Sequence, residues 1–258
     1  MSDTNEPLAP EVIEAYLTRI GLSESPELTL DGLTTLQQSH LSTVPFENLD
    51  VASGIGVATD LDHSIDKVVS RNRGGWCFEL NGAFAALLRS LGFPVVHLGA
   101  AVLLEGPTTV IDHLTLEVMV DQPYLVDVGF GDSFTTPLLL NSGDEQDGGS
   151  GTFQLIASPQ GTTLARIDDG VPAAQYRFKR VAHTLSDFTA ASNALQDDRT
   201  LHWSTKPFAT RLIDGGPDRV TLLKDRLKFT GGAASEESVA PEDWADTLEQ
   251  WFGMSPPS

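Results

Sequence analysis

A single cysteine, Cys77, stands in the string RNRGGWCFELN at positions 71–81 and is the one candidate for a sulfur nucleophile. The apolar spacing after it predicts a helix that begins at Cys77, where unpaired backbone N–H groups and the helix dipole favour a thiolate. Arg71 and Arg73 act in the same direction. This help is needed because an unperturbed thiol has a pKa of about 8.5. A lone cysteine is also commonly a small buried hydrophobic residue, so the string leaves both roles open.

A nucleophilic cysteine needs a base, and among the six histidines His113 fits that role. It precedes an alternating apolar segment, 114–120, and the next predicted strand, 124–128, carries Asp127. A carboxylate in an apolar strand needs a hydrogen-bond partner. A hairpin that turns at 121–123 places the partner of Asp127 near residue 117, so contact with His113 requires a shift or a twist. A water-solvated His113, and an Asp127 that caps the turn at Gly129, remain alternatives.

Other site chemistries lack their motifs. No two histidines are three or four residues apart, and Cys77 has no partner at metal-ligand spacing, so we expect no metal. The triplet at 129–131, GFG, is too short for a dinucleotide fingerprint and has no predicted helix after it. Neither a phosphate-binding G-x-x-x-x-G-K-[ST] string nor a G-x-S-x-G string occurs.

The elements that would position these residues fall into an order. Helical spacing predicts helices near 10–21, 31–42, 64–71 and 77–91, the last followed by Gly92 and Pro94 as stop signals. Strands are predicted near 95–104, 114–120, 124–128, 152–156, 162–167 and 174–181. A solvated loop is expected at 141–151 and an irregular segment at 196–204. A hairpin near 219–229 and a closing helix near 241–252 complete the chain, which predicts an α+β fold.

The amino-acid composition argues against some classes of binding partner. The 258 residues include 36 Asp and Glu against 16 Lys and Arg, a net charge of −20, which repels nucleic acid and anionic membranes. No apolar run reaches the roughly 18 residues of a membrane span. The polar, acidic start does not resemble a secretory signal. One cysteine excludes an internal disulfide, so we expect a cytoplasmic protein.

Four strings resemble motifs of the arylamine N-acetyltransferases: VPFENL at 44–49, RGGWCFELN at 73–81, DHL at 112–114 and DVGFG at 127–131. They occur in the family's order. The resemblance implies a helical bundle at 1–92 carrying the nucleophile, an antiparallel β-barrel at 93–195 carrying His and Asp, and an α/β lid at 196–258. It also implies a Cys-His-Asp core like that of the cysteine proteases.

The resemblance further implies residue roles. Cys77 would be the acyl-accepting nucleophile, His113 its base and Asp127 the orienter of His113. Arg73 and Glu79 would support the start of the helix. The remaining assignments are an acceptor pocket lined by Phe46, Phe130 and Phe208, and a coenzyme A pantetheine path along Thr109, Gly129 and Gly131. Because the chain is acidic, we expect Lys67, Arg71, Lys206 or Arg211 to offset the charge of the coenzyme locally.

The implied reaction is ping-pong transfer of acetyl from acetyl-CoA, through Cys77, to an aromatic amine or hydrazine, with O-acetylation of N-hydroxyarylamines as an extension. Three alternatives remain. A macrolactam-forming amide synthase would use the same triad, and an amidase would let water reach the acyl-enzyme. A non-catalytic module that binds acyl-CoA or an aromatic ligand would leave Cys77 unreactive.

Overall fold

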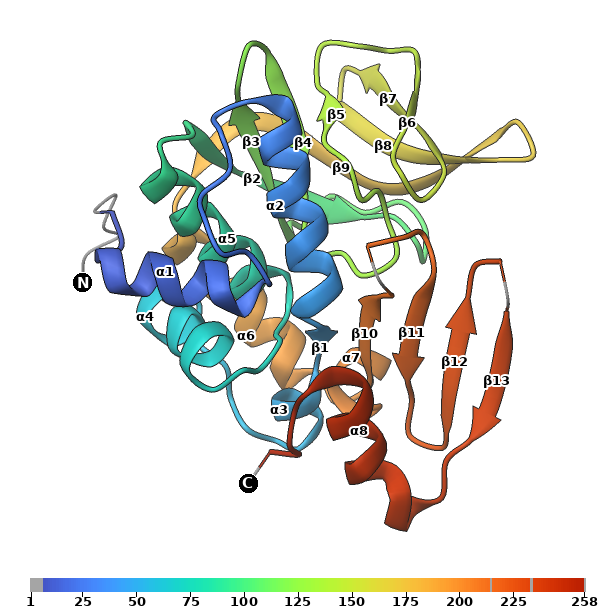
Figure 1. Ribbon diagram of the computed structural model, residues 1–258. Helices are drawn as coiled ribbons and strands as arrows, with labels where there is room; N and C mark the ends of the chain where they lie inside the picture. The colour runs from blue at the N-terminus through green and yellow to red at the C-terminus, as the bar shows by residue number, and fades with distance from the viewer. Residues whose placement is uncertain (1–6, 214, 233, 258) are drawn as a thin grey trace.

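The computed structural model describes residues 7–213, 215–232 and 234–257. Helices of the N-terminal part lie beside an eight-stranded sheet, and a second sheet with a C-terminal helix lies at the other end of the molecule (Figure 1). The predicted α+β architecture of bundle, barrel and C-terminal lid is confirmed. Among the described residues, no helix is long and apolar enough to cross a membrane.

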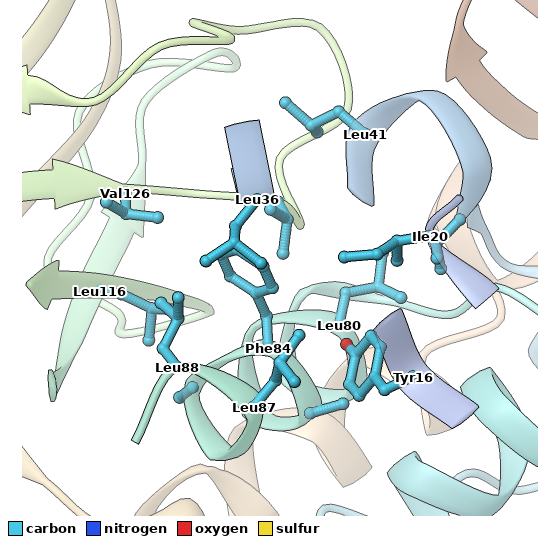
Figure 2. Packing of buried hydrophobic residues seen from close by; sticks show 14 of the residues in the cluster. Tyr16, Ile20, Leu36, Leu41, Leu80, Phe84, Leu87, Leu88, Leu116 and Val126 are labelled. Carbon is cyan, nitrogen blue, oxygen red and sulfur yellow. The ribbon is translucent and has the colours of Figure 1, made fainter. Parts of the chain in front are cut away.

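The N-terminal part is built around α5. Its helices are α1 (Pro10–Arg19), α2 (Leu30–Thr43), α3 (Leu49–Ala52), α4 (Leu61–Ile65), the π-helical turn η1 (Asp66–Ser70) and α5 (Cys77–Leu91). The α5 helix lies inside the molecule: residues 77–88 are all buried, the polar Glu79 and Asn81 among them. Its side chains Leu80, Phe84, Leu87 and Leu88 lie in one cluster with residues from α1 and α2 and with Leu116 and Val126 of the central sheet (Figure 2). Gly92, at a φ of 108°, ends the helix as predicted.

The central sheet forms a nearly closed barrel with the strand order β5-β4-β3-β2-β9-β8-β7-β6. Its strands are β2 (Val95–Val102), β3 (His113–Met119), β4 (Pro123–Val126), β5 (Leu138–Leu139), β6 (Glu145–Asp147), β7 (Thr152–Ser158), β8 (Gly161–Asp168) and β9 (Val171–His183). The two edge strands are bridged by Gln146 of β6, whose side-chain oxygen and nitrogen bond the backbone of Leu139 in β5 at 2.7 and 3.2 Å. The expected loop at 141–151 therefore contains a short strand.

The β3–β4 register differs from the sequence estimate by two residues. Leu116 pairs with Val126 and Glu117 with Leu125. Continued by one step, this register sets Asp127 opposite Thr115 rather than near residue 117, so that estimate is wrong. Side chains two residues apart share a face of a strand. His113 is therefore the diagonal neighbour of Asp127 on that face, within reach without a bulge.

The C-terminal sheet includes a strand from the first third of the chain. Its order is β1-β10-β11-β12-β13, with β1 (Phe46–Glu47), β10 (Ala209–Leu212), β11 (Arg219–Leu222), β12 (Arg226–Thr230) and β13 (Ser235–Ser238). The helix α8 (Trp244–Phe252), preceded by the 3₁₀ turn η3 (Pro241–Asp243), packs its apolar residues against this sheet. The domain boundaries at 92 and 195 stay a prediction, and β1 belongs by its pairing to the last sheet.

Three short helices connect the barrel to that sheet: η2 (Leu185–Phe188), α6 (Thr189–Asp197) and α7 (His202–Thr205). The segment 196–204, expected to be irregular, thus contains the end of α6 and most of α7. Phe188 and Leu185 pack against Phe78 of α5 and Trp76 in one cluster that also includes Cys77. The connecting helix η2 therefore forms part of the surroundings of the candidate nucleophile.

Candidate active site

The three residues expected to form a triad lie together. Cys77 is the first residue of α5, His113 the first of β3, and Asp127 follows β4. His113 Nε2 lies 2.7 Å from Asp127 Oδ2, and the Cys77 thiol is a hydrogen-bond partner of the imidazole. Because Nε2 is occupied by Asp127, Nδ1 is the nitrogen left for the sulfur. All three side chains are buried.

Burial and neighbouring charges shift the pKa values of His113 and Asp127 in opposite directions. Burial lowers the pKa of His113, but the Asp127 carboxylate and the Cys77 sulfur outweigh it and raise the pKa to about 10. Burial likewise raises the pKa of Asp127, and His113, together with hydrogen bonds from Asn81 and Gly129, brings it below its ordinary value. At neutral pH the pair is therefore an imidazolium and a carboxylate. The His113 imidazolium faces the Cys77 sulfur across a hydrogen bond.

This pair predicts a stability that falls with rising pH. The pKa of His113 is about 10 in the folded state and about 6.5 in an unfolded chain. Its contribution is therefore complete below about pH 6.5 and is lost as the pH rises through about 10. We expect the free energy of unfolding, from urea titrations, to fall more steeply over this range in wild type than in His113→Asn. Parallel curves for the two proteins would contradict the assignment.

Two residues that hold Asp127 lie outside the expected triad. Asn81, one helical turn after Cys77, donates from Nδ2 to Asp127 Oδ1 at 2.9 Å and to the Leu114 carbonyl at 2.6 Å. Tyr176 of β9 hydrogen-bonds Asp127 and Thr115, and its ring centroid lies 5.0 Å from that of His113. Helical spacing from Cys77 could have indicated Asn81. No sequence signal pointed to Tyr176, which reaches the site only through the pairing of β9 with β2.

A buried ion network lies beneath the start of α5. Lys67 Nζ is 2.9 Å from Glu79 Oε1 and 2.8 Å from Asp50 Oδ2, and Arg73 Nη2 is 2.8 Å from Glu47 and 3.0 Å from Asp50. Glu79 Oε2 accepts from the Trp76 backbone N–H at 3.0 Å, next to the nucleophile. The structural roles expected of Arg73 and Glu79 fit these contacts.

The contacts of Lys67 and Arg211 contradict the expectation that these two side chains offset the charge of the coenzyme. Lys67 is 1% exposed and engaged by carboxylates, so it cannot meet a ligand phosphate. Arg211 donates to the backbone carbonyls of Ser42, Leu212 and Trp251. Burial works against the Lys67 charge, yet its three carboxylate neighbours raise the pKa of Lys67 above its ordinary value. The ammonium is thus part of the scaffold.

Lys67→Met should destabilise the fold strongly. The substitution leaves buried carboxylates without their nearest cation, which typically lowers the free energy of unfolding by about 3–5 kcal/mol. Urea unfolding measures the change. Arg71→Gln is the control, because Arg71 pairs with Asp66 in a half-exposed position, and such pairs contribute at most about 1 kcal/mol. Similar losses for the two variants would refute the central role of Lys67.

Gly129 has a steric reason to be glycine. A Cβ at this position would lie 2.6 Å from Cys77 Cα and 2.8 Å from Asn81 Nδ2. The backbone N–H of Gly129 also donates to Asp127 Oδ1 at 2.9 Å. Any side chain here would push Cys77 or Asn81 away from Gly129, and Asn81 holds Asp127.

We therefore expect Gly129→Ala to slow the reaction of Cys77 with iodoacetamide and with acyl thioesters by roughly 100-fold, since a misplacement of about 1 Å can have that effect. Stopped reactions followed by intact mass measure both rates. Gly56→Ala is the matched control, because the nearest atom to its added Cβ is 3.8 Å away. Equal rates in the two variants would show that the close approach is unimportant.

A cavity of about 640 Å³ opens at the triad. Cys77 and His113 line it, and so do Phe46, Phe130 and Phe208, the three aromatic residues expected to line an acceptor pocket. The Phe46 and Phe208 ring centroids are 5.5 Å apart. The Phe130 and His113 ring centroids are 5.2 Å apart, with the two ring planes at 78° to each other. The cavity that Cys77 lines thus offers aromatic surfaces to a ligand.

Of the three residues expected along the pantetheine path, only Gly129 lines the cavity. Thr109 is exposed and lies outside the lining, whereas its neighbours Thr108 and Val110 belong to it. Gly131, at a φ of 90°, is also outside the lining, and a Cβ added to it would be 3.1 Å from the Phe46 ring. Within the described ranges, no group of three or more His, Cys, Asp or Glu side chains could hold a metal.

Several known proteins are similar to this chain in sequence. A family model described as N-acetyltransferase matches residues 29–256. The pineal gland isozyme NAT-3 arylamine N-acetyltransferase of Gallus gallus is 39% identical, covering 94% of both chains. Arylamine N-acetyltransferase 1 of Homo sapiens is 32% identical with the same coverage.

Solved structures of arylamine N-acetyltransferases have a similar fold. The Mycobacterium marinum arylamine N-acetyltransferase in complex with CoA superposes with a TM-score of 0.86 at 30% identity, covering 94% of this chain and 92% of that one. The Salmonella typhimurium enzyme gives a TM-score of 0.90 at 28% identity, covering 96% and 92%. With a family match over most of its length and with the motif residues gathered around one cavity, the chain belongs to the arylamine N-acetyltransferase family.

Proposed function

We propose that the protein transfers acetyl from acetyl-CoA to arylamines and arylhydrazines by a ping-pong mechanism, with Cys77 as nucleophile, His113 as base and acid, and Asp127 as the residue that orients His113. The observation that carries this proposal is the buried His113–Asp127 pair beside Cys77, at one end of an aromatic-lined cavity. Family membership and the CoA complex of the related M. marinum enzyme support the choice of donor.

In the first half-reaction, the Cys77 sulfur attacks the thioester carbonyl and forms a tetrahedral oxyanion. The Cys77 backbone N–H, in the first turn of α5, is the candidate donor to that oxyanion. The bond to the coenzyme sulfur breaks, and the departing thiolate takes the proton held by His113. The products are free CoA and an acetyl thioester on Cys77.

In the second half-reaction, the amine nitrogen attacks the acetyl-enzyme and passes a proton to His113. The C–S bond to Cys77 breaks, which restores the thiolate–imidazolium pair and releases the amide. Aromatic amines suit the cavity because they are neutral at pH 7 and stack on phenylalanine. Phe46, Phe130 and Phe208 are proposed to hold the ring, and Gly129 lies on the proposed path of the pantetheine arm.

Incubation with acetyl-CoA followed by intact mass tests the mechanism. We expect an acetyl adduct that maps to Cys77 and is discharged by an arylhydrazine such as hydralazine. No adduct, with Cys77 slow toward iodoacetamide, would favour a binding module instead. An adduct discharged by water as fast as by the amine would favour a hydrolase.

We propose that the protein works in the cytoplasm and that it has no nucleic-acid partner. A catalytic thiol must stay reduced, which a reducing compartment ensures, and Cys77 is free. The net charge of −20 opposes a polyanionic partner. Cell fractionation and a nucleic-acid filter-binding assay test the two points.

A further inference from the structure

The charged groups around the candidate active-site cavity are mostly acidic. No Lys or Arg of the described residues lines it, and besides Cys77 its ionisable lining residues are Glu47, Glu105, Asp112, His113 and His202. Glu47 is neutralised by its contact with Arg73, and its Oε2 accepts from a backbone N–H at 2.6 Å. Two carboxylates therefore remain without a Lys or Arg partner: Asp112 on the wall and Glu105 at the mouth.

Asp112 is held in place beside the triad. Its Oδ1 accepts from the Val102 backbone N–H at 2.8 Å, and it immediately precedes His113. Burial raises the pKa of its carboxyl, and the hydrogen bond from Val102 and the His113 charge only partly oppose this. A poorly solvated carboxylate gains from a nearby cation or N–H donor and is disturbed by a second anion. Asp112 therefore discriminates between ligand charges at close range.

Glu105 carries the same negative charge as Asp112, but it lies in a more solvent-exposed place. Its side chain is 77% exposed, and His202 of α7 approaches it at 3.9 Å across the mouth. Water and salt screen a charge in such a place. Glu105 therefore adds to the field at the entrance, and the larger part of the discrimination falls to Asp112.

We propose that Asp112, supported by Glu105, makes this site select aromatic amines that carry a cationic group away from the reacting nitrogen, and disfavour those that carry a carboxylate. The inference rests on the proposed function, since it concerns the acceptor of the second half-reaction. Because coenzyme A carries phosphate charges of its own, the comparison is confined to discharge of the acetyl-enzyme, a step in which the coenzyme takes no part.

Three para-substituted anilines test the inference: (4-aminobenzyl)trimethylammonium, 4-aminophenylacetamide and 4-aminophenylacetate. They are cationic, neutral and anionic, and the methylene spacer keeps their reacting nitrogens similar. The readout is the second-order rate of acetyl-enzyme discharge by each, divided by its uncatalysed rate with an activated acetyl ester. We expect the cation to exceed the anion by about tenfold or more at low salt, with the ratio shrinking in 0.5 M NaCl.

Asp112→Asn keeps an oxygen for the Val102 N–H and removes the charge, so the cation-to-anion ratio should fall toward one. The ratio is taken within each variant, so a general change in rate, which the neutral aniline reports, cancels. Glu105→Gln should lower the ratio by a smaller factor. Asp132→Asn is the matched control, because Asp132 lies outside the cavity lining and is largely exposed. A wild-type ratio near one, or a ratio unchanged in Asp112→Asn, overturns the inference. Failure of the neutral aniline to discharge the acetyl-enzyme would count against the proposed function instead.

Discussion

Cys77→Ala is expected to abolish acetyl transfer, with a loss of at least about 10⁴-fold and no acetyl adduct by intact mass. The substitution removes the atom that accepts the acetyl group, and removing the nucleophile of a triad leaves only binding and oxyanion contributions. The measurements are adduct formation with acetyl-CoA and steady-state acetylation of an arylhydrazine.

The fold should survive this change. Cys77 is buried in a cluster with Trp76, Phe78 and Leu114, so alanine removes a single sulfur from a packed site. Urea unfolding of the variant therefore serves as the control and should show a loss of no more than about 1–2 kcal/mol. Residual adduct on Cys77→Ala, at any other residue, would contradict Cys77 as the acyl carrier.

Asp127→Asn is expected to slow formation of the acetyl-enzyme by about 10³–10⁴-fold, as the same change does in a serine protease triad. The geometry dictates how the amide would lie. Asn81 Nδ2 and the Gly129 N–H both donate to Oδ1 at 2.9 Å, so the amide oxygen must take that position. The NH₂ group then faces His113 Nε2, where Oδ2 accepts in the wild type.

An NH₂ group at that position forces the wrong tautomer. His113 Nε2 must then accept, so the ring proton moves to Nδ1, on the side of Cys77, and the imidazole can no longer take the thiol proton. Single-turnover acylation and the pH dependence of iodoacetamide alkylation measure both effects. Asp187→Asn, at an exposed turn near the end of β9, is the control and should leave both unchanged. A loss below about tenfold for Asp127→Asn would contradict the orienting role.

Local sequence signals determined much of the architecture. The apolar residues after Cys77 and the Gly92 stop predicted α5 to the residue, because a mostly apolar helix is buried and glycine readily adopts the left-handed conformation that ends it. The alternation in 114–120 and the turn at 121–123 predicted the β3–β4 hairpin for the same kind of local reason. The four motifs also led to the family and to Cys77, His113 and Asp127.

The tertiary structure alone decided how those residues meet. The β3–β4 register, which the turn residues did not specify, sets His113 diagonal to Asp127. Tyr176, nearly fifty residues further along the chain, joins the pair through the β2–β9 pairing. Long-range strand pairing depends on the packing of whole faces rather than on neighbours in sequence, so no local pattern could have shown this contact.

The same limit explains the other differences. Lys67 looked like a surface cation suited to a phosphate, yet its ammonium lies among three carboxylates drawn from α3, α5 and β1. Gly129 looked like part of a ligand path, and the close approach of Cys77 gives it a second reason to be glycine. The sequence by itself determined which residues are proposed to carry the chemistry. The tertiary structure decided their protonation, their supports and the charge of the cavity, because these depend on distances between segments far apart in the chain.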